Sequence, residues 1–294
     1  MTGNPVRPEP DAVEGGLAPV RIGRFILRAP GPLVMGIVNL TPDSFYDGGR
    51  SLDPGKTISH AKRLIDEGAD IVDIGAESTR PGADPVDVRV ELERLRPLLA
   101  ALRDSPVPVS VDTMKPEVMR IAIGEGAAMI NDVYALRAPG ALEAVAGTDA
   151  SVCLMHMQGE PRTMQTSPFY EDVVSEVRGF LAERADAVVA SGLSRERIFV
   201  DPGFGFGKTV DHNMRLLACL ESFRQLGYPV LFGASRKSSL GTITGREPDD
   251  RLAASLAVAL MAAERGAAVL RVHDVTETRD VLKVLASLRK VAEG

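Results

Sequence analysis

The 294-residue chain has no tryptophan, and aromatic residues make up only 4% of it. Because 45% of the residues are hydrophobic, aliphatic side chains must build the core. The only two cysteines, Cys153 and Cys219, lie in separate apolar segments without CxxC spacing. This disfavours a disulfide scaffold and a structural zinc site, and it predicts two buried free thiols.

The chain is also short of positive charge and of long apolar runs. Its formal net charge is −6, which disfavours general nucleic-acid binding but leaves room for a local basic pocket. No run reaches the roughly 18 apolar residues of a membrane span. Residues 1–19 are rich in Pro, Gly and acids, which is typical of a disordered tail and not of a secretory signal. We expect a cytoplasmic protein that binds neither membranes nor nucleic acids.

What the sequence does contain is a series of short apolar runs, each followed by a stretch with helical spacing. The eight runs cover residues 34–39, 70–75, 107–113, 128–132, 151–156, 197–203, 228–237 and 268–273. Alternating strands and helices predict an α/β fold with a parallel sheet, and eight units fit a single (β/α)8 TIM barrel. Residues 20–28 alternate polar and apolar side chains, which predicts a short N-terminal strand or hairpin extension. The barrel domain is therefore expected to span residues 20–294.

Polar residues end the predicted strands, and barrel enzymes carry their chemistry at that end. These residues are Asn39, Asp73, Asp112, Asn131, His156, Asp201, Lys237, Arg271 and His273. A carboxylate in apolar surroundings is costly unless it binds a cation or N–H donors. The three aspartates therefore suit the N–H edge of an amidine-like heterocycle, although any one of them could instead cap the next helix.

A predicted basic corner complements these acids. Arg271 and His273 are two residues apart on a strand, so their side chains point the same way, just before a helix N-terminus. The segment 233–241 adds Arg236 and Lys237 on the neighbouring strand. This corner suits phosphate or pyrophosphate. Asn39 could offer a neutral oxygen to magnesium, or could simply be a turn residue.

Flexible segments complete the predicted site. Residues 200–209 are glycine-rich but lack the Walker spacing, so we expect a turn that lets Phe206 approach a flat ligand. One of Phe204 and Phe206 should belong to the core. Loops 40–53 and 75–87 are rich in turn formers and are expected to close over the ligand. No Ser–His–Asp or Cys–His set is recognisable, so the enzyme should act by positioning and charge stabilisation.

Between about residues 33 and 290 the chain resembles the dihydropteroate synthase family of bacterial folate synthesis. The motifs are GIVNLTPDSFYDGG (36–49), DIGAESTRPGA (73–83), VSVDTMKPEV (109–118), INDV (130–133), MHMQGEPRTMQ (155–165), VDPGFGFGKT (200–209), GASRKSSLG (233–241) and RVHDV (271–275). The resemblance implies a homodimeric, magnesium-dependent transferase that is a sulfonamide target. It would join 6-hydroxymethyl-7,8-dihydropterin diphosphate to p-aminobenzoate, giving 7,8-dihydropteroate and pyrophosphate.

The resemblance also implies residue roles. The pterin ring would be held by Asp73, Thr79, Asp112, Asn131, Asp201 and Lys237. The diphosphate would be held by Arg271, His273 and Asn39, of which Asn39 would also bind magnesium. The aminobenzoate pocket would be shaped by Thr79, Arg80, Pro81, Phe206, Lys237 and Ser238. Catalysis would depend most on Lys237, Arg271 and His273.

Two alternatives to this family stay open at the level of sequence. A methyltetrahydrofolate:corrinoid methyltransferase would share the pterin-binding acids but should lack the STRPG and SRKS elements. A non-catalytic paralogue should have lost polar site residues.

Overall fold

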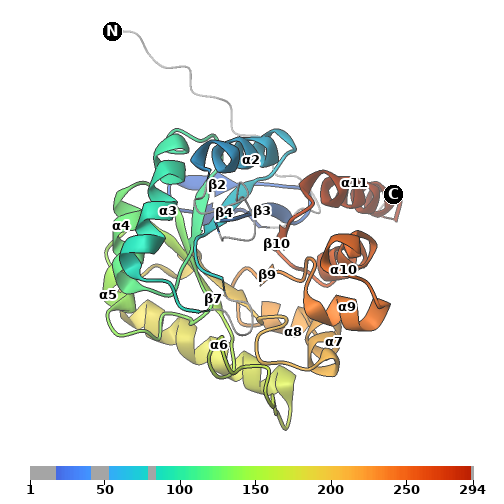
Figure 1. Cartoon of the computed structure of the whole chain (residues 1–294). Coiled ribbons are helices and arrows are strands. Elements are labelled where there is room, and N and C mark those ends of the chain that lie inside the picture. The colour runs from blue at the N-terminus through green and yellow to red at the C-terminus, as the bar shows by residue number, and fades with distance from the viewer. Residues whose placement is uncertain (1–17, 41–52, 79–83, 293–294) are drawn as a thin grey trace.

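The computed structural model describes residues 18–40, 53–78 and 84–292 (Figure 1). Residues 1–17 of the expected tail, most of loop 40–53, and Thr79, Arg80 and Pro81 lie outside these ranges.

Eight parallel strands form the predicted barrel (Figure 1). They are β3 Leu33–Asn39, β4 Ile71–Gly75, β5 Val109–Asp112, β6 Met129–Asp132, β7 Ser151–Met155, β8 Ile198–Asp201, β9 Leu231–Phe232 and β10 Val269–Val272. Their order in the sheet is β8-β7-β6-β5-β4-β3-β10-β9. A parallel bridge between Val200 and Val230 joins the two ends of this order, which closes the barrel next to the very short β9.

Helices surround the strands (Figure 1). They are α2 Pro54–Asp66, α3 Val88–Ala101, α4 Pro116–Gly124, α5 Ala141–Val145, α6 Val173–Ala190, α7 Val210–Ala218, α8 Glu221–Arg224, α9 Ser238–Thr244, α10 Leu252–Glu264 and α11 Val275–Ala292. Two short 3-10 turns lie at Arg195–Arg197 and Pro248–Asp250. Aspartate side chains accept backbone N–H groups at the starts of α2, α3 and α6, as is usual for N-caps.

Helix α9 departs from the sequence prediction. The strand expected over residues 228–237 is reduced to β9, and the end of segment 233–241 is helical. Ser, Thr, Ile and Gly in α9 are weak helix formers, so local propensity gives little signal there. Tertiary contacts compensate, because Leu240 is buried and Asn213 Nδ2 donates to Ser239 Oγ at 2.9 Å.

The predicted extension is a hairpin of β1 Val20–Ile22 and β2 Phe25–Leu27. Its turn residue Gly23 has φ +56°, and a Cβ there would lie 2.9 Å from Ala128 Cβ. Ser151 Oγ accepts from Gly23 N at 3.2 Å and donates to Arg21 O at 2.9 Å. Because Ala128 precedes β6 and Ser151 begins β7, the hairpin lies at the end of the barrel opposite the polar residues.

Aliphatic side chains fill the core, as the composition predicts. One cluster lies between strands and helices, and a smaller one lies inside the barrel and includes Met35, Phe199 and Cys153. Cys153 is buried as expected, but Cys219 at the end of α7 is exposed, so the prediction of two buried thiols is wrong for Cys219. Among the described helices, none is long and apolar enough to cross a membrane.

Candidate functional site

Several polar strand ends meet inside the mouth of the barrel. Strand register places Asp73 of β4 beside Ser110 of β5, and Asp112 of β5 beside Asn131 of β6. Asp73 and Asn131 are completely buried, and Asn131 Nδ2 donates to Asp73 Oδ2 at 3.3 Å. Three neighbouring strands therefore bring two carboxylates and an amide together, as predicted.

Arg271 joins these acids directly. Its Nε donates to Asp73 Oδ2 at 2.6 Å and its Nη2 to Asp112 Oδ2 at 3.0 Å. Only β3 separates β10 from β4, and β3 and β4 separate it from β5, so the long side chain spans one strand to reach Asp73 and two to reach Asp112. Acids and bases were predicted to form separate corners, whereas Arg271 lies among the acids.

This contact shapes the electrostatics of the network. Burial raises the pKa of Asp112, against the opposing charge of Arg271. Burial alone would lower the pKa of Arg271, but Asp73 and Asp112 outweigh it, and the pKa is raised. The guanidinium therefore stays charged, and its positive charge offsets the repulsion between the two adjacent buried carboxylates.

Two oxygens of the network have no hydrogen-bond partner among the described residues. They are Asp73 Oδ1 and Asn131 Oδ1. An unpartnered buried acceptor costs about 1–3 kcal/mol. Such atoms are common where a ligand completes the site, and here they favour a ligand rich in N–H donors.

Asp201 and Lys237 form the opposite wall of the barrel mouth. Asp201 ends β8, is buried, and accepts from Gly203 N at 2.7 Å. Burial raises the pKa of Asp201, and the positive charge of Lys237 opposes that rise. Lys237 Nζ donates to the Phe204 carbonyl and lies 4.4 Å from the centre of the Phe206 ring. Burial lowers the pKa of Lys237 to about 8, so a proton on this side chain is sensitive to mildly alkaline pH.

The two phenylalanines beside Lys237 have different roles. Phe204 is fully buried and contacts Phe232 edge-to-face at a centroid distance of 5.6 Å. Phe206 is only partly buried and contacts the methionine cluster of Met155, Met157 and Met164. The prediction that one of the pair is core is therefore confirmed for Phe204, and Phe206 is the one that faces the site.

The remaining predicted residues lie around this centre. His273 Nδ1 is hydrogen-bonded to Ser235 Oγ at 2.9 Å. Arg236 pairs with Asp274 at 2.5 Å, and this ion pair links the β9–α9 loop to the β10–α11 loop. Ser238 begins α9 and is exposed, and Asn39 ends β3 next to Gly75. Thr79, Arg80 and Pro81 lie outside the described residues.

The base of the loop that carries those three residues is well anchored. Lys115 Nζ donates to Glu77 and, at 2.5 Å, to the fully buried Glu91. The other oxygen of Glu77 accepts from Val86 N at 3.1 Å. Glu77 therefore ties the two ends of segment 77–86 to each other and to the β5–α4 loop.

Sequence reasoning missed some buried groups at the mouth. Asp132 accepts from Tyr134 N and Leu136 N, both at 2.7 Å, and so fixes the turn after β6. Burial raises the pKa of Asp132 to about 6. His156 does not join the acids but contacts Lys208, for which no role was predicted. Asp132 directly follows Asn131 in the sequence, and that adjacency was the available signal.

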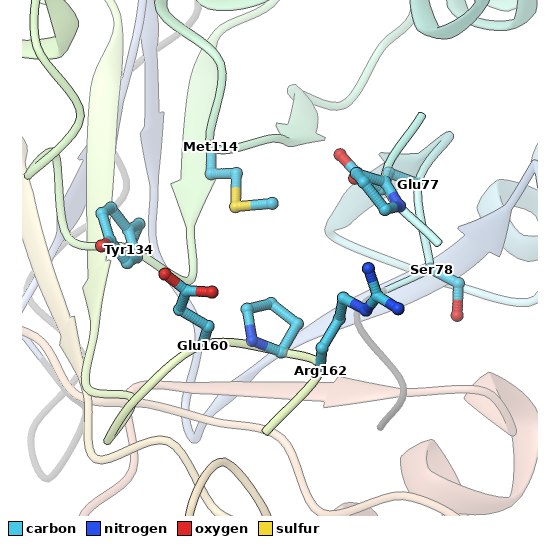
Figure 2. Close-up of a pocket in the computed structure, with 8 residues that line it drawn as sticks. Glu77, Ser78, Met114, Tyr134, Glu160 and Arg162 are labelled. Carbon is cyan, nitrogen blue, oxygen red and sulfur yellow. The ribbon is translucent and has the colours of Figure 1, made fainter. Parts of the chain in front are cut away.

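A cavity of about 260 Å³ opens beside the network (Figure 2). It is lined by Glu77, Ser78, Pro85, Met114, Tyr134, Glu160, Pro161 and Arg162. These residues follow β4, β5, β6 and β7, which places the cavity at the mouth of the barrel. Met114 and Tyr134 lie only two and three residues beyond Asp112 and Asn131. The open space therefore adjoins the acid network without being lined by it.

Comparison with known proteins assigns the chain to a family. The sequence model described as "Pterin binding enzyme" matches residues 35–273. The dihydropteroate synthase of Haemophilus influenzae is 48% identical over 254 residues, which cover 86% of this chain and 92% of that protein. That of Escherichia coli K12 is 47% identical over 264 residues, covering 90% and 94%. The chain belongs to the dihydropteroate synthase family.

Solved structures agree with this assignment. Xanthomonas albilineans dihydropteroate synthase with 4-aminobenzoic acid has a TM-score of 0.87 at 51% identity, and the match covers 92% of this chain and 98% of that one. The Burkholderia cenocepacia enzyme complexed with 7,8-dihydropteroate has the same score and identity, over 95% and 99%. The predicted family, the barrel fold and the class of enzyme, a transferase, are confirmed. A Yersinia pestis dihydropteroate synthase has been solved with a sulfonamide drug, at a TM-score of 0.88 and 42% identity over 93% of this chain and 100% of that one.

Proposed function

We propose that this dihydropteroate synthase holds the pterin diphosphate across the barrel mouth and binds p-aminobenzoate next to it, beside Phe206. The observation that carries the proposal is the buried Asp73–Arg271–Asp112 network, which combines unpartnered acceptors with a fixed cation. The dihydropterin presents N–H donors to the acceptors. Its diphosphate presents negative charge to the cation. The same network can therefore bind both the pterin ring and the diphosphate of this substrate.

The pterin ring lies, in this proposal, between Asp112 and Asn131 on one side and Asp201 on the other. Asp201 is fixed by Gly203 N through one oxygen, so its carboxylate is oriented before the ligand arrives. A carboxylate accepts two N–H donors from an aminopyrimidine edge in a bidentate manner. Asp73 and Lys237 support this arrangement by position and charge.

The diphosphate is assigned to Arg271, His273 and Asn39. The two ion pairs of Arg271 use Nε and Nη2, which leaves Nη1 for a phosphate oxygen. Ser235 holds the His273 ring through Nδ1, and so orients it at the end of β10. These strand ends match the region near strands 7 and 8 where barrels commonly bind phosphate.

Magnesium fits this donor set. Mg²⁺ typically takes only one or two protein ligands and fills its shell with water and substrate phosphates. Consistent with that, the described residues contain no cluster of three or more His, Cys, Asp or Glu side chains suited to a metal. The amide oxygen of Asn39 would hold the ion. When bound, magnesium would neutralise negative charge on the leaving pyrophosphate.

The reaction we infer is a displacement at the pterin methylene carbon. The carbon–oxygen bond to the diphosphate breaks, and its electron pair leaves with pyrophosphate. The neutral arylamine nitrogen forms the new carbon–nitrogen bond and loses a proton to water or pyrophosphate. Arg271 and His273 stabilise the leaving charge, and the buried carboxylates stabilise positive charge that develops on the ring. No strong general base is needed.

The p-aminobenzoate site is assigned to Phe206, Lys237 and Ser238, with Thr79, Arg80 and Pro81 as further predicted members. Phe206 offers a partly exposed aromatic face beside an ammonium group. A flat benzoate ring fits such a face, and its carboxylate is attracted to the positive charge.

A homodimer is supported by an apolar stripe on α11. Val284, Leu288 and Val291 share one face of this helix and are 63–80% exposed. Met261 on α10 and Ile243 on α9 are also exposed. Helix α10 lies between α9 and α11 and contacts both (Figure 1). A second copy of the chain would cover this surface. Leu288→Glu should shift a dimer to a monomer in analytical ultracentrifugation, and an unchanged mass would argue against this interface.

The free thiols of Cys153 and Cys219 support the inferred cytoplasmic location.

The direct test of the proposal is turnover. The enzyme is incubated with magnesium, 6-hydroxymethyl-7,8-dihydropterin diphosphate and p-aminobenzoate, and pyrophosphate release is measured with 7,8-dihydropteroate formation. The two products should appear in equal amounts. Release of pyrophosphate without dihydropteroate would contradict the proposed arrangement of the site, since it would mean that water and not the arylamine attacks.

A further inference from the structure

Lys208 is a buried lysine to which the reaction assigns no role. It is 2% exposed, and its Nζ contacts three acceptors. They are His156 Nδ1 at 2.9 Å, Phe206 O at 2.9 Å and His156 O at 3.3 Å. The three acceptors match the three N–H donors of a protonated lysine, although burial lowers the pKa of Lys208 well below its ordinary value. The neutral amine keeps two N–H donors, which is enough to bind Phe206 O and one acceptor of His156.

His156 is adapted to this contact. Burial lowers the pKa of His156 to about 2, and the positive charge of Lys208 adds to the effect. The ring is therefore neutral, and its Nδ1 accepts from Lys208. Phe180 meets the ring edge-on at a centroid distance of 4.9 Å and keeps it in place. Lys208 thus has a rigid anchor on the β7 side.

The loop above this anchor lies directly on the neighbouring backbone. A Cβ on Gly203 would be 1.9 Å from His156 O, and one on Gly207 would be 2.6 Å from Gln158 O. Both glycines have positive φ, so a side chain there would also strain the backbone. Segment 203–207 therefore has no room to shift toward residues 156–158. Side chains hold this segment in place through hydrogen bonds: Asn213 and Gln165 bind Gly205, Tyr170 binds Gly207 O, and Lys208 binds Phe206 O.

The same loop faces the substrate site with its other side. Lys237 donates to Phe204 O and lies over the Phe206 ring. Two lysines thus hold one loop, Lys237 from the site and Lys208 from beneath. We propose that Lys208 is a positioning residue that fixes the Phe206 carbonyl, and through it the Phe206 ring, as the wall of the p-aminobenzoate pocket. This inference rests on the proposed assignment of Phe206 to that pocket.

The test compares Lys208→Met with two reference variants. Phe206→Ala removes the proposed wall itself. Arg184→Met removes a cation that likewise donates to two loop carbonyls, those of Ala135 and Leu136, but in the β6–α5 loop. Steady-state KM is measured for each substrate separately, and amide hydrogen exchange of residues 203–207 is measured in the free enzyme.

Lys208→Met should raise the KM for p-aminobenzoate at least about tenfold, since it removes the hydrogen bond that fixes the Phe206 carbonyl. The KM for the pterin diphosphate should change less than about threefold, and exchange in residues 203–207 should accelerate. Arg184→Met should leave both KM values and this exchange unchanged. A general loss of stability would not produce such a split between the substrates.

The Phe206→Ala variant distinguishes the role of Lys208 from the assignment of Phe206 to the p-aminobenzoate pocket. If Phe206→Ala raises the KM for p-aminobenzoate and Lys208→Met does not, Lys208 has no positioning role. If Phe206→Ala has no effect, the pocket assignment is wrong and the role of Lys208 falls with it. Should Lys208→Met fail to fold, Lys208→Gln still donates two hydrogen bonds and should show the same split to a smaller degree. Equal rises in both KM values would overturn the inference.

Discussion

Replacing Arg271 by methionine isolates the energetic role of the buried network. Methionine keeps an unbranched apolar side chain but leaves Asp73 and Asp112 without their shared cation. Two charge-assisted hydrogen bonds are lost, at about 1.5–3 kcal/mol each. Breaking a buried ion pair by removing one partner costs roughly 3–5 kcal/mol. We therefore expect the free energy of unfolding at about pH 8 to fall by some 3–5 kcal/mol, a large part of the roughly 5–15 kcal/mol typical of a folded protein.

This loss should depend on pH with a definite sign. Burial already raises the pKa of Asp112, and removing Arg271 removes the charge that opposes the rise. A carboxyl group whose pKa is raised in the folded state binds more protons there than in the unfolded state. The variant therefore gains stability as the pH falls toward the unfolded pKa of about 4, and it loses stability as the pH rises. Its deficit should be largest near pH 8 and clearly smaller near pH 5.5.

Urea unfolding followed by circular dichroism at these two pH values measures both quantities. Arg236→Met is the matched control, because it breaks the more exposed pair with Asp274 and should cost no more than about 1 kcal/mol. A deficit below about 1 kcal/mol for Arg271→Met at pH 8, or the same deficit at both pH values, would refute the reasoning.

The same substitution should separate two ligands. Affinity for the pterin diphosphate should fall by about 1.5–3 kcal/mol more than affinity for a pterin without phosphates, or roughly 10- to 150-fold. Calorimetric titration provides the comparison. Equal weakening of both ligands would mean that Arg271 only holds the carboxylates in place.

Three further predictions concern the other parts of the site. Asp201→Asn should abolish pterin binding in calorimetric titration while circular dichroism shows an intact fold, because an amide cannot accept both N–H donors of the pterin edge; unchanged affinity would sink the assignment. Since burial lowers the pKa of Lys237 to about 8, its ammonium is present below that pH and lost above it. The kcat/KM for the pterin diphosphate should therefore fall above about pH 8, whereas a profile that stays flat to about pH 10 would speak against Lys237. A sulfonamide should bind at least about tenfold more tightly with magnesium pyrophosphate present, because charge brought to the barrel mouth is expected to complete the p-aminobenzoate pocket. Identical dissociation constants would defeat this ordered binding.

The barrel could be predicted because buried parallel strands leave a clear record of apolar runs with polar ends. The strand positions of Asp73, Asp112 and Asn131 followed from that record alone. The contact between Arg271 and Asp73 did not, because 198 residues separate them and only the closed sheet brings β10 within one strand of β4. Helix α9 was missed for the opposite reason, since its weak local propensity is overridden by packing.

The buried support of the site was harder still to predict. Lys208 and His156 are ordinary polar residues in the sequence, and their pairing depends on two loops lying in contact through Gly203 and Gly207. In the sequence, these glycines predict only a turn. What they permit is close approach of two backbones, and that is visible only in three dimensions.

The shortness of β9 affects how readily proteases should cleave the enzyme. The barrel closes there through two residues and a single bridge, so local opening should begin between β8 and β9. If the pterin binds both Asp201 and Lys237, as proposed, it links β8 to β9, because Asp201 ends β8 and Lys237 follows β9. Ligand binding lowers the population of opened molecules, and opened molecules are those that proteases cleave. The ligand-free enzyme should therefore be cleaved by proteases faster than the enzyme with pterin bound.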